Sequence, residues 1–285
     1  MQWYFILLIV LGSLFLLMAA LFIFLTAGKS GKALGRLGSV NYAHRGLHGT
    51  VGGYDTYAAE NSLTAFARAK EQGFGIELDV RLTKDGSLVV FHDDTLDRVC
   101  GISGRVDALT LNELSETRLS GTDDTVPTFA EVLTLIGGEV PLLIELKGES
   151  MSADVADATA RALLGYEGEY IIESFNPVLL GRIKKLLPEA KRGFLLSKHT
   201  NDPKHRSVKY RIIQRCLLNF IARPHFIALD KSYPRLFPAP LVIKLFGTAK
   251  IAWTVRSPEE EEKAYRDGFS AVIFEKFLSG RGKSR

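Results

Sequence analysis

The chain has 285 residues, of which 46% are hydrophobic and 24% charged, and its formal net charge is +4. This length suits one large domain or two small ones, and the charged fraction is ordinary for a soluble domain. The two cysteines, Cys100 and Cys216, lie far apart without metal-ligand spacing, which argues against a disulfide framework or a zinc site and is compatible with a reducing compartment.

Residues 1–28 form an apolar segment without a charged side chain. About 20 apolar residues span the hydrocarbon core of a bilayer, and this segment is longer. Trp3 and Tyr4 lie at one end, where interfacial aromatic residues belong. The alternative, a cleaved signal peptide, would have a basic start and an apolar core of roughly 7–15 residues. We therefore expect residues 1–28 to be an uncleaved, single-pass transmembrane anchor.

The residues that follow this segment predict its orientation. Lys29, Lys32 and Arg36 come at once, whereas no Lys or Arg precedes the apolar run. The positive-inside rule then places the remainder of the chain in the cytoplasm, attached to the cell membrane. Residues 29–39 are rich in Gly and Ser and predict a short linker, which leaves residues 40–285 as one folded domain.

The folded domain alternates short β-rich runs with helical patterns. An N-cap pattern is clearest before residues 258–268, where Ser257 precedes Pro258 and several acids. The run 87–92 is extra, and the turn at 83–86 predicts that it pairs with the preceding strand as a hairpin. Eight alternating strands over about 245 residues predict an α/β fold, a (β/α)₈ TIM barrel, after the single transmembrane helix. The eight expected strands are 40–44, 76–80, 142–146, 170–174, 191–196, 226–230, 251–255 and 271–275.

Polar residues interrupt several of these apolar strands. Glu77 and Asp79 point to the same face of one strand, where two buried carboxylates repel each other unless a cation or solvent compensates. Charged residues also stand at the ends of other strands, and chemistry in such a barrel sits at the carboxyl ends. The residues at these strand ends are His44, Arg45, Glu77, Asp79, His92, Glu145, Lys147 and Trp253.

Each of these residues also has an ordinary structural interpretation, as a hydrogen-bonded histidine, a surface ion pair or an acid on an exposed strand face. Their convergence favours a site, because parallel barrel strands are covered on both faces. Three carboxylates suit a hard cation such as Mg²⁺ or Ca²⁺. Arg45 and Lys147 with that cation would clamp a phosphate, and two histidines would move protons. The pattern indicates metal-assisted phosphodiester cleavage.

The chain resembles the glycerophosphodiester phosphodiesterase family from about residue 40 to 278. The resemblance rests on AHRG, AENSLTAFARAKEQGFGIELDVRLTKDGSLVVFHDDTLDR, LLIELKG and IAWTV, in this order. It implies a metal-dependent TIM barrel that hydrolyses glycerophosphodiesters to glycerol 3-phosphate and an alcohol. The implied roles are acid and base for His44 and His92, metal ligands for Glu77, Asp79 and Glu145, phosphate contacts for Arg45 and Lys147, support for Glu60 and Asn61, and pocket lining for Trp253.

Two features depart from the family pattern. Arg256 stands after WTV, where the family often has Asn, and a Gly-rich, lid-like loop with a second histidine, His48, separates His44 from Glu60. Neither change affects the implied metal ligands, so we expect the same reaction chemistry. The identity of the substrate is not predicted. A lysophospholipase D acting on membrane lipid is the close alternative, and a non-catalytic binding barrel is the alternative from another class.

A basic stretch covers residues 182–215, with eleven Lys or Arg and two acids. Its ordinary interpretation is a barrel helix that packs its apolar side inward. The functional interpretation is a basic surface on anionic lipid headgroups, a membrane partner in addition to the anchor. Nucleic acid is not an expected partner, because no recognition motif accompanies the charge.

Overall fold

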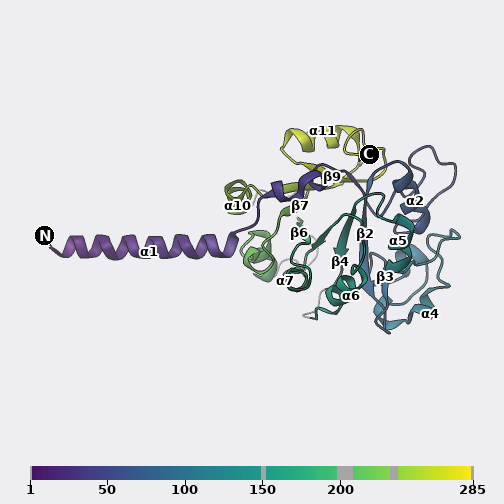
Figure 1. Ribbon diagram of the computed structural model, residues 1–285, viewed down its shortest axis with the longest axis horizontal. Helices are drawn as coiled ribbons and strands as arrows, with labels where there is room; N and C mark the ends of the chain where they lie inside the picture. Colours follow the sequence, from purple (N-terminus) through teal and green to yellow (C-terminus); the bar gives the residue numbers. More distant parts are fainter. Residues whose placement is uncertain (1, 149–151, 198–207, 232–236, 284–285) are drawn as a thin grey trace.

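In the computed structural model, the chain after the first helix closes into a barrel (Figure 1). The structure describes residues 2–148, 152–197, 208–231 and 237–283. Eight parallel strands pair in the order β1, β9, β8, β7, β6, β5, β4, β2, and β2 returns to β1 to close the ring. The expected (β/α)₈ barrel is therefore confirmed. Its strands are β1 (Tyr42–Ala43), β2 (Gly75–Leu82), β4 (Leu142–Leu146), β5 (Tyr170–Ser174), β6 (Lys191–Leu196), β7 (Phe226–Asp230), β8 (Ala249–Val255) and β9 (Ala271–Phe274).

Helices surround this barrel, and local signals set where they begin and end. Thr128 and Glu131 form a capping box at the start of α5, and Gly137 ends that helix in a left-handed conformation. The expected N-cap Ser257 accepts a hydrogen bond from the Glu260 amide at the start of α11. The helices are α2 (Leu63–Glu71), α5 (Phe129–Ile136), α6 (Asp154–Ala162), α7 (Pro177–Leu186), α8 (Val208–Gln214), α9 (Asn219–Ala222), α10 (Ala239–Phe246) and α11 (Pro258–Arg266).

The segment after β2 adds a small lobe at the carboxyl end of the barrel. Strand β3 (Leu88–Val90) pairs antiparallel with β2, and the Thr83 amide donates to the Ser87 carbonyl, as the hairpin prediction required. The chain then forms three short helices around a separate apolar cluster before it reaches α5. These short helices are α3 (Asp97–Cys100), η2 (Val106–Ala108) and α4 (Leu111–Leu114).

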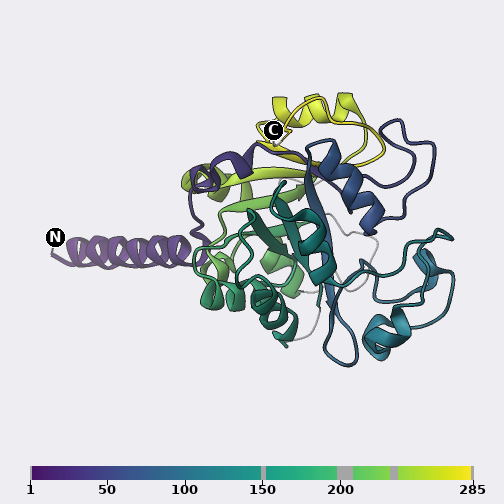
Figure 2. The same ribbon diagram turned by 45° about the vertical axis from the view of Figure 1, so that its right-hand side comes forward.

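Helix α1 (Gln2–Thr26) projects from the other side of the barrel, away from α4 (Figures 1 and 2). Among the described residues it is the one helix long and apolar enough to cross a membrane, and its apolar side chains are exposed. Twenty-five helical residues measure roughly 37 Å, more than the roughly 30 Å hydrocarbon core of a bilayer.

The segment predicted to be a linker is folded onto the barrel. Residues Gly31–Gly38 form the 3₁₀ helix η1, and Leu34 and Leu37 are 3% and 8% exposed. They pack with Tyr42 and Phe226 in the apolar cluster that fills the barrel at the amino ends of its strands. Gly31 lies so close to Ala249 that any Cβ would collide with that residue. Gly31 therefore serves close packing, and Gly35 permits the kink inside η1, where its φ is 56°.

We predict that Leu34→Ala lowers the free energy of unfolding by about 2–4 kcal/mol, because it empties part of a buried cluster. The matched control is Lys32→Ala, an exposed position in the same 3₁₀ helix, which should change it by at most about 0.5 kcal/mol. Urea unfolding of both proteins in detergent measures the difference. Equal stabilities would show that η1 is a tether that does not support the barrel.

Candidate active site

Three carboxylates meet at the carboxyl ends of β2 and β4. Glu77 and Asp79 lie two residues apart on β2, and Asp79 is paired across the strands with Glu145 of β4. All three are buried, with exposed fractions of 2%, 0% and 6%. One oxygen from each lies within 4.8 Å of the others, a spacing that suits one metal ion. Buried hard oxygen donors in this number fit Mg²⁺ or Ca²⁺.

The electrostatics of this cluster depend on two cations. Lys147 places its Nζ 3.0 Å from Asp79 and 2.7 Å from Glu145. Burial raises the pKa of Asp79, but Lys147, His92 and Arg45 outweigh it and hold that pKa well below its usual value. Burial, then repulsion from Asp79 and Glu145, raises the pKa of Glu77. When all three carboxylates are ionised, their negative charge exceeds the positive charge of Lys147 and Arg45, and a bound cation would compensate the difference.

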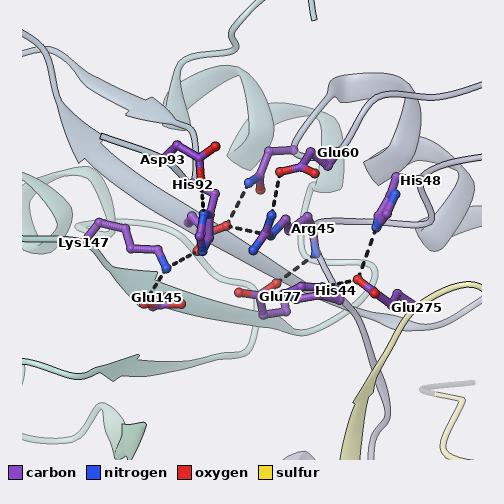
Figure 3. A network of polar contacts seen from close by, with 12 residues as sticks. His44, Arg45, His48, Glu60, Glu77, His92, Asp93, Glu145, Lys147 and Glu275 are labelled. Carbon is purple, nitrogen blue, oxygen red and sulfur yellow. Dashed lines mark hydrogen bonds and ion pairs between the residues drawn. The ribbon is translucent and has the colours of Figure 1, made fainter. Parts of the chain in front are cut away.

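Both predicted histidines are held by carboxylates. His44 Nδ1 lies 2.7 Å from Glu275 Oε2, just beyond β9, and His92 Nδ1 lies 2.6 Å from Asp93 Oδ1. In each pair the carboxylate engages Nδ1, which leaves Nε2 for another partner. Figure 3 shows the two pairs on either side of Arg45 and Glu77. Burial lowers the pKa of His44 to about 4, against the Glu275 hydrogen bond that raises it, so His44 is neutral at pH 7.

Arg45 links the carboxylates to the predicted supporting residues. Its amide donates to Glu77 at 2.8 Å, and its Nη1 donates to Glu60 at 2.6 Å. Asn61 Nδ2 donates to Asp79 at 2.8 Å, and the Asn61 amide donates to the Arg45 carbonyl. Arg45 and Asn61 both adopt positive φ, 55° and 56°, which is unfavourable for residues with a side chain. These contacts hold that backbone in place.

Trp253 lies on β8, apart from the polar network. Its ring packs edge-on against Phe175, with centroids 5.8 Å apart. Its indole Nε1 is buried and has no hydrogen-bond partner in the described part of the chain. An indole donor without a partner is compatible with the predicted pocket-lining role.

Sequence reasoning missed several residues of the network. Glu275, which contacts His44, is the last residue of the run expected as the eighth strand. An acid at the carboxyl end of that strand could have identified it as a site residue. Glu173 is paired with Glu145 across β4 and β5, is 1% exposed, and has both oxygens without a hydrogen-bond partner among the described residues. Burial, then Glu145 and Glu77, raises its pKa. Arg98, which binds both Glu60 and Asp93, lies in the small lobe and gave no sequence signal.

The two departures from the family pattern meet at one residue. Arg256 Nε donates to Glu275 Oε1 at 2.5 Å, and His48 Nε2 lies 3.8 Å from Glu275 Oε2. His44, His48 and Glu275 also have metal-ligand spacing. Arg256 already pairs with that carboxylate, so the three-carboxylate cluster is the stronger candidate for a cation. The loop after His44 is folded back, because the Gly49 and Ala58 backbones pair with each other.

The family model for the glycerophosphoryl diester phosphodiesterase family matches residues 44–277. This chain belongs to that family. The match includes both histidine–carboxylate pairs and the three carboxylates. The family resemblance and the enzyme class, a phosphoric diester hydrolase, are thereby confirmed.

Individual relatives agree with the family. A glycerophosphodiester phosphodiesterase of Caldanaerobacter subterraneus subsp. tengcongensis is 33% identical over 81% of this chain and 91% of its own. Among solved structures, an Oleispira antarctica phosphodiesterase in complex with the product sn-glycerol-3-phosphate has a TM-score of 0.67 at 26% identity, covering 84% of this chain and 94% of its own. A Thermotoga maritima glycerophosphodiester phosphodiesterase has a TM-score of 0.62 at 28% identity, covering 82% and 93%.

We predict that Mg²⁺ or Ca²⁺ raises the melting temperature of the wild-type protein after EDTA treatment, because the ion relieves repulsion among the three carboxylates. At a hundredfold excess over the dissociation constant the gain is about 2.7 kcal/mol. Asp79→Asn should abolish the gain, whereas Asp123→Asn, an exposed acid, should keep it. A metal-dependent shift that survives in Asp79→Asn would place the ion elsewhere.

A second prediction concerns the pKa of His44. The Glu275 carboxylate stabilises the protonated imidazole, so Glu275→Gln should lower that pKa below its wild-type value. Arg256→Gln removes a cation beside the same carboxylate and should raise it. An NMR titration of the His44 ring in each protein measures the two shifts. Shifts of the same sign in both variants would contradict the electrostatic coupling.

Proposed function

We propose that this protein is a metal-dependent enzyme that hydrolyses glycerophosphodiesters to glycerol 3-phosphate and an alcohol. The observation that carries the proposal is the placement of two carboxylate-held histidines on either side of a buried cluster of carboxylates, Arg45 and Lys147. An anionic phosphodiester fits between two proton-transfer groups only where cations hold it. Family membership supplies the same substrate class.

Glu77, Asp79 and Glu145 would hold the divalent cation, and Mg²⁺ or Ca²⁺ is the proposed ion. When bound, it supplies positive charge that draws the phosphate in and stabilises charge on its oxygens. Lys147 already contacts two of the three carboxylates and Arg45 lies 3.5 Å from Asp79, so both can also reach a phosphate beside the ion. Their fixed cations orient the diester.

The histidines carry the protons of the reaction. A new P–O bond forms to the attacking oxygen while the P–O bond to the leaving alcohol breaks. One histidine accepts the proton of the attacking oxygen, and the other gives a proton to the alcohol. His44 is neutral at pH 7 and therefore suits the accepting role, which leaves the donating role to His92. Glu275 and Asp93 fix the ring orientations.

We also propose that α1 is an uncleaved membrane anchor with the barrel on the cytoplasmic side. Its length and exposed apolar surface support a span, and Lys29, Lys32 and Arg36 follow it directly. A cleaved signal sequence can share this length and apolar composition. The last turn of α1, however, is bonded to the barrel through Asn219 and Arg223, which favours retention.

The second candidate function is a lysophospholipase D that acts on membrane lipid. The proposed anchor favours it, because such an enzyme would meet its substrate at the bilayer. A non-catalytic barrel is the remaining alternative. An assay of glycerol 3-phosphate release from glycerophosphocholine, with and without EDTA, distinguishes the enzyme from a non-catalytic barrel. Metal-dependent release supports the proposed enzyme, and no release with any divalent ion would contradict it.

We predict that His44→Ala and His92→Ala each reduce turnover of glycerophosphocholine by at least about 10²-fold, the usual contribution of a general acid or base. A nitrophenyl diester needs no proton on its leaving group, so it should restore more activity to His92→Ala than to His44→Ala. Steady-state kinetics of both variants on both substrates measures this. Rescue in the reverse order would exchange the two roles, and mild, equal defects would make both histidines structural.

A further inference from the structure

We infer that the amino-terminal face of the barrel lies on an anionic bilayer, so that the active site opens away from the membrane and takes its diester from water. The amino-terminal face means the end of the barrel at which the strands begin. This inference rests on the proposed function and its membrane anchor, and it selects between the two substrate classes left open above.

The anchor is bonded to that face. Arg223 Nη1 donates to the Phe24 and Ala27 carbonyls at 2.9 and 3.0 Å, and Asn219 Nδ2 donates to the Thr26 carbonyl at 2.8 Å. The last carbonyls of a helix have no partner within it, and here barrel side chains supply the partners. The Lys29 amide then donates to the Pro224 carbonyl at 2.7 Å. Asn219, Arg223 and Pro224 all precede β7, so α1 ends beneath the barrel.

Basic side chains gather around the end of α1. Arg223 contacts the Phe24 and Ala27 carbonyls, and Lys184 Nζ donates to the Ile221 carbonyl, two residues before Arg223. In keeping with these contacts, burial and then the charges of Arg192, Arg223, Lys29 and Lys185 lower the pKa of Lys184. Lys29 and Lys185 are exposed. Arg192 is buried and bonded to the Ala222 carbonyl, so it is not a surface charge. Like charges held together repel, and anionic headgroups beside the anchor would relieve that repulsion.

Within the described residues, only part of the basic stretch expected at 182–215 forms a charged surface. Besides Arg192, Arg182 is taken up by an ion pair with Asp157, and Lys184 also donates to the Ile221 carbonyl. Lys198, Lys204 and Arg206 lie outside the described residues, as does the side chain of Lys209. Among the described basic residues, those around the end of α1 adjoin the proposed anchor, and we assign the membrane contact to them. Arg215, directly after α8, instead donates to the carbonyl of Arg211 in that helix.

An apolar surface adjoins the same end of the anchor. Helix α10 leads into β8 and ends at Gly247, whose carbonyl accepts a hydrogen bond from the Gly31 amide. On this helix Leu241 and Leu245 are 47% and 57% exposed, while Val242 faces the core. In Figures 1 and 2 α10 lies beside the barrel end of α1. Exposed leucines next to a membrane span suit insertion into the headgroup boundary.

The active site lies at the opposite end of the barrel. Asp79 is four residues beyond Gly75, the first residue of β2, which is roughly 13 Å along the strand. Helix η1 covers the strand starts and adds about 10 Å of thickness. The carboxylate cluster thus sits roughly 20 Å above the face that carries α1. A long-chain lysolipid would have to leave the bilayer to reach it, and each methylene drawn out lowers its population roughly fourfold.

The orientation is tested with full-length protein in vesicles of phosphatidylcholine and phosphatidylglycerol. A spin label is attached to Leu245→Cys or, in a separate protein, to Tyr57→Cys, an exposed position in the loop after β1; both carry Cys100→Ser. We expect oxygen to reach the label at 245 and a water-soluble nickel complex to reach the label at 57. Equal nickel access at both positions, or lipid contact at 57, would overturn the inference.

The contribution of the basic residues is tested by Lys29→Gln/Lys185→Gln in the Leu245→Cys protein. This change should increase nickel access to the label at 245, and replacing phosphatidylglycerol with phosphatidylcholine should do the same. The matched control is Lys84→Gln/Arg118→Gln, two exposed cations at the carboxyl end of the barrel, which should change nothing. An unchanged label in the first variant would overturn the role given to these charges.

Substrate access is measured in the same vesicles. We expect dissolved glycerophosphocholine to be hydrolysed and long-chain lysophosphatidylcholine in the bilayer to be hydrolysed at least about 200-fold more slowly, the effect of drawing out four methylenes. Comparable rates would overturn the inference while leaving the phosphodiesterase function intact. Failure of the proposed function is distinct, because it would abolish turnover of glycerophosphocholine in detergent as well as in vesicles, whatever the labels report.

Discussion

Repulsion among three buried carboxylates is the interaction on which the rest of the site depends. Barrel strands place Glu77, Asp79 and Glu145 where solvent cannot screen them, and neighbouring groups are arranged in response. Lys147 and Arg45 approach Asp79, and the Arg45 backbone adopts an unfavourable φ that lets its amide reach Glu77. Buried charges of one sign are tolerated only with such compensation, and a shortfall of positive charge becomes affinity for a cation.

Charges around the two histidines are likewise compensated by neighbouring charges of opposite sign. Each imidazole is bonded to one carboxylate, and each carboxylate is in turn bonded to an arginine, Arg256 for Glu275 and Arg98 for Asp93. The arginine limits how strongly the carboxylate can stabilise a protonated ring. Arg256 thus belongs to a chain of charged contacts that ends at His44. Its effect is to favour the neutral ring, the state in which an imidazole accepts a proton.

The sequence alone predicted the barrel and predicted that the polar residues at the strand ends lie close together, because both follow from local patterns. Alternating apolar runs predict strands, and parallel strands bring their carboxyl ends to one place. It was insufficient for Arg98, whose position depends on how the lobe after β3 folds back. For residues 29–39 the sequence suggested a flexible linker, but small residues permit close packing as readily as flexibility. The packing of Leu34 and Leu37 inside the barrel shows that close packing applies here.

If α1 is the membrane anchor proposed above, its hydrogen bonds to the barrel also bear on how long the enzyme stays attached. A protease needs an extended, accessible stretch of backbone, but the Ala27 carbonyl and the Lys29 amide are both bonded to the barrel, and Thr26 is fully buried. Cleavage between anchor and barrel would first require this junction to open. Each molecule would then diffuse in two dimensions for its whole lifetime and deplete soluble diesters only in the thin layer of water next to its own membrane.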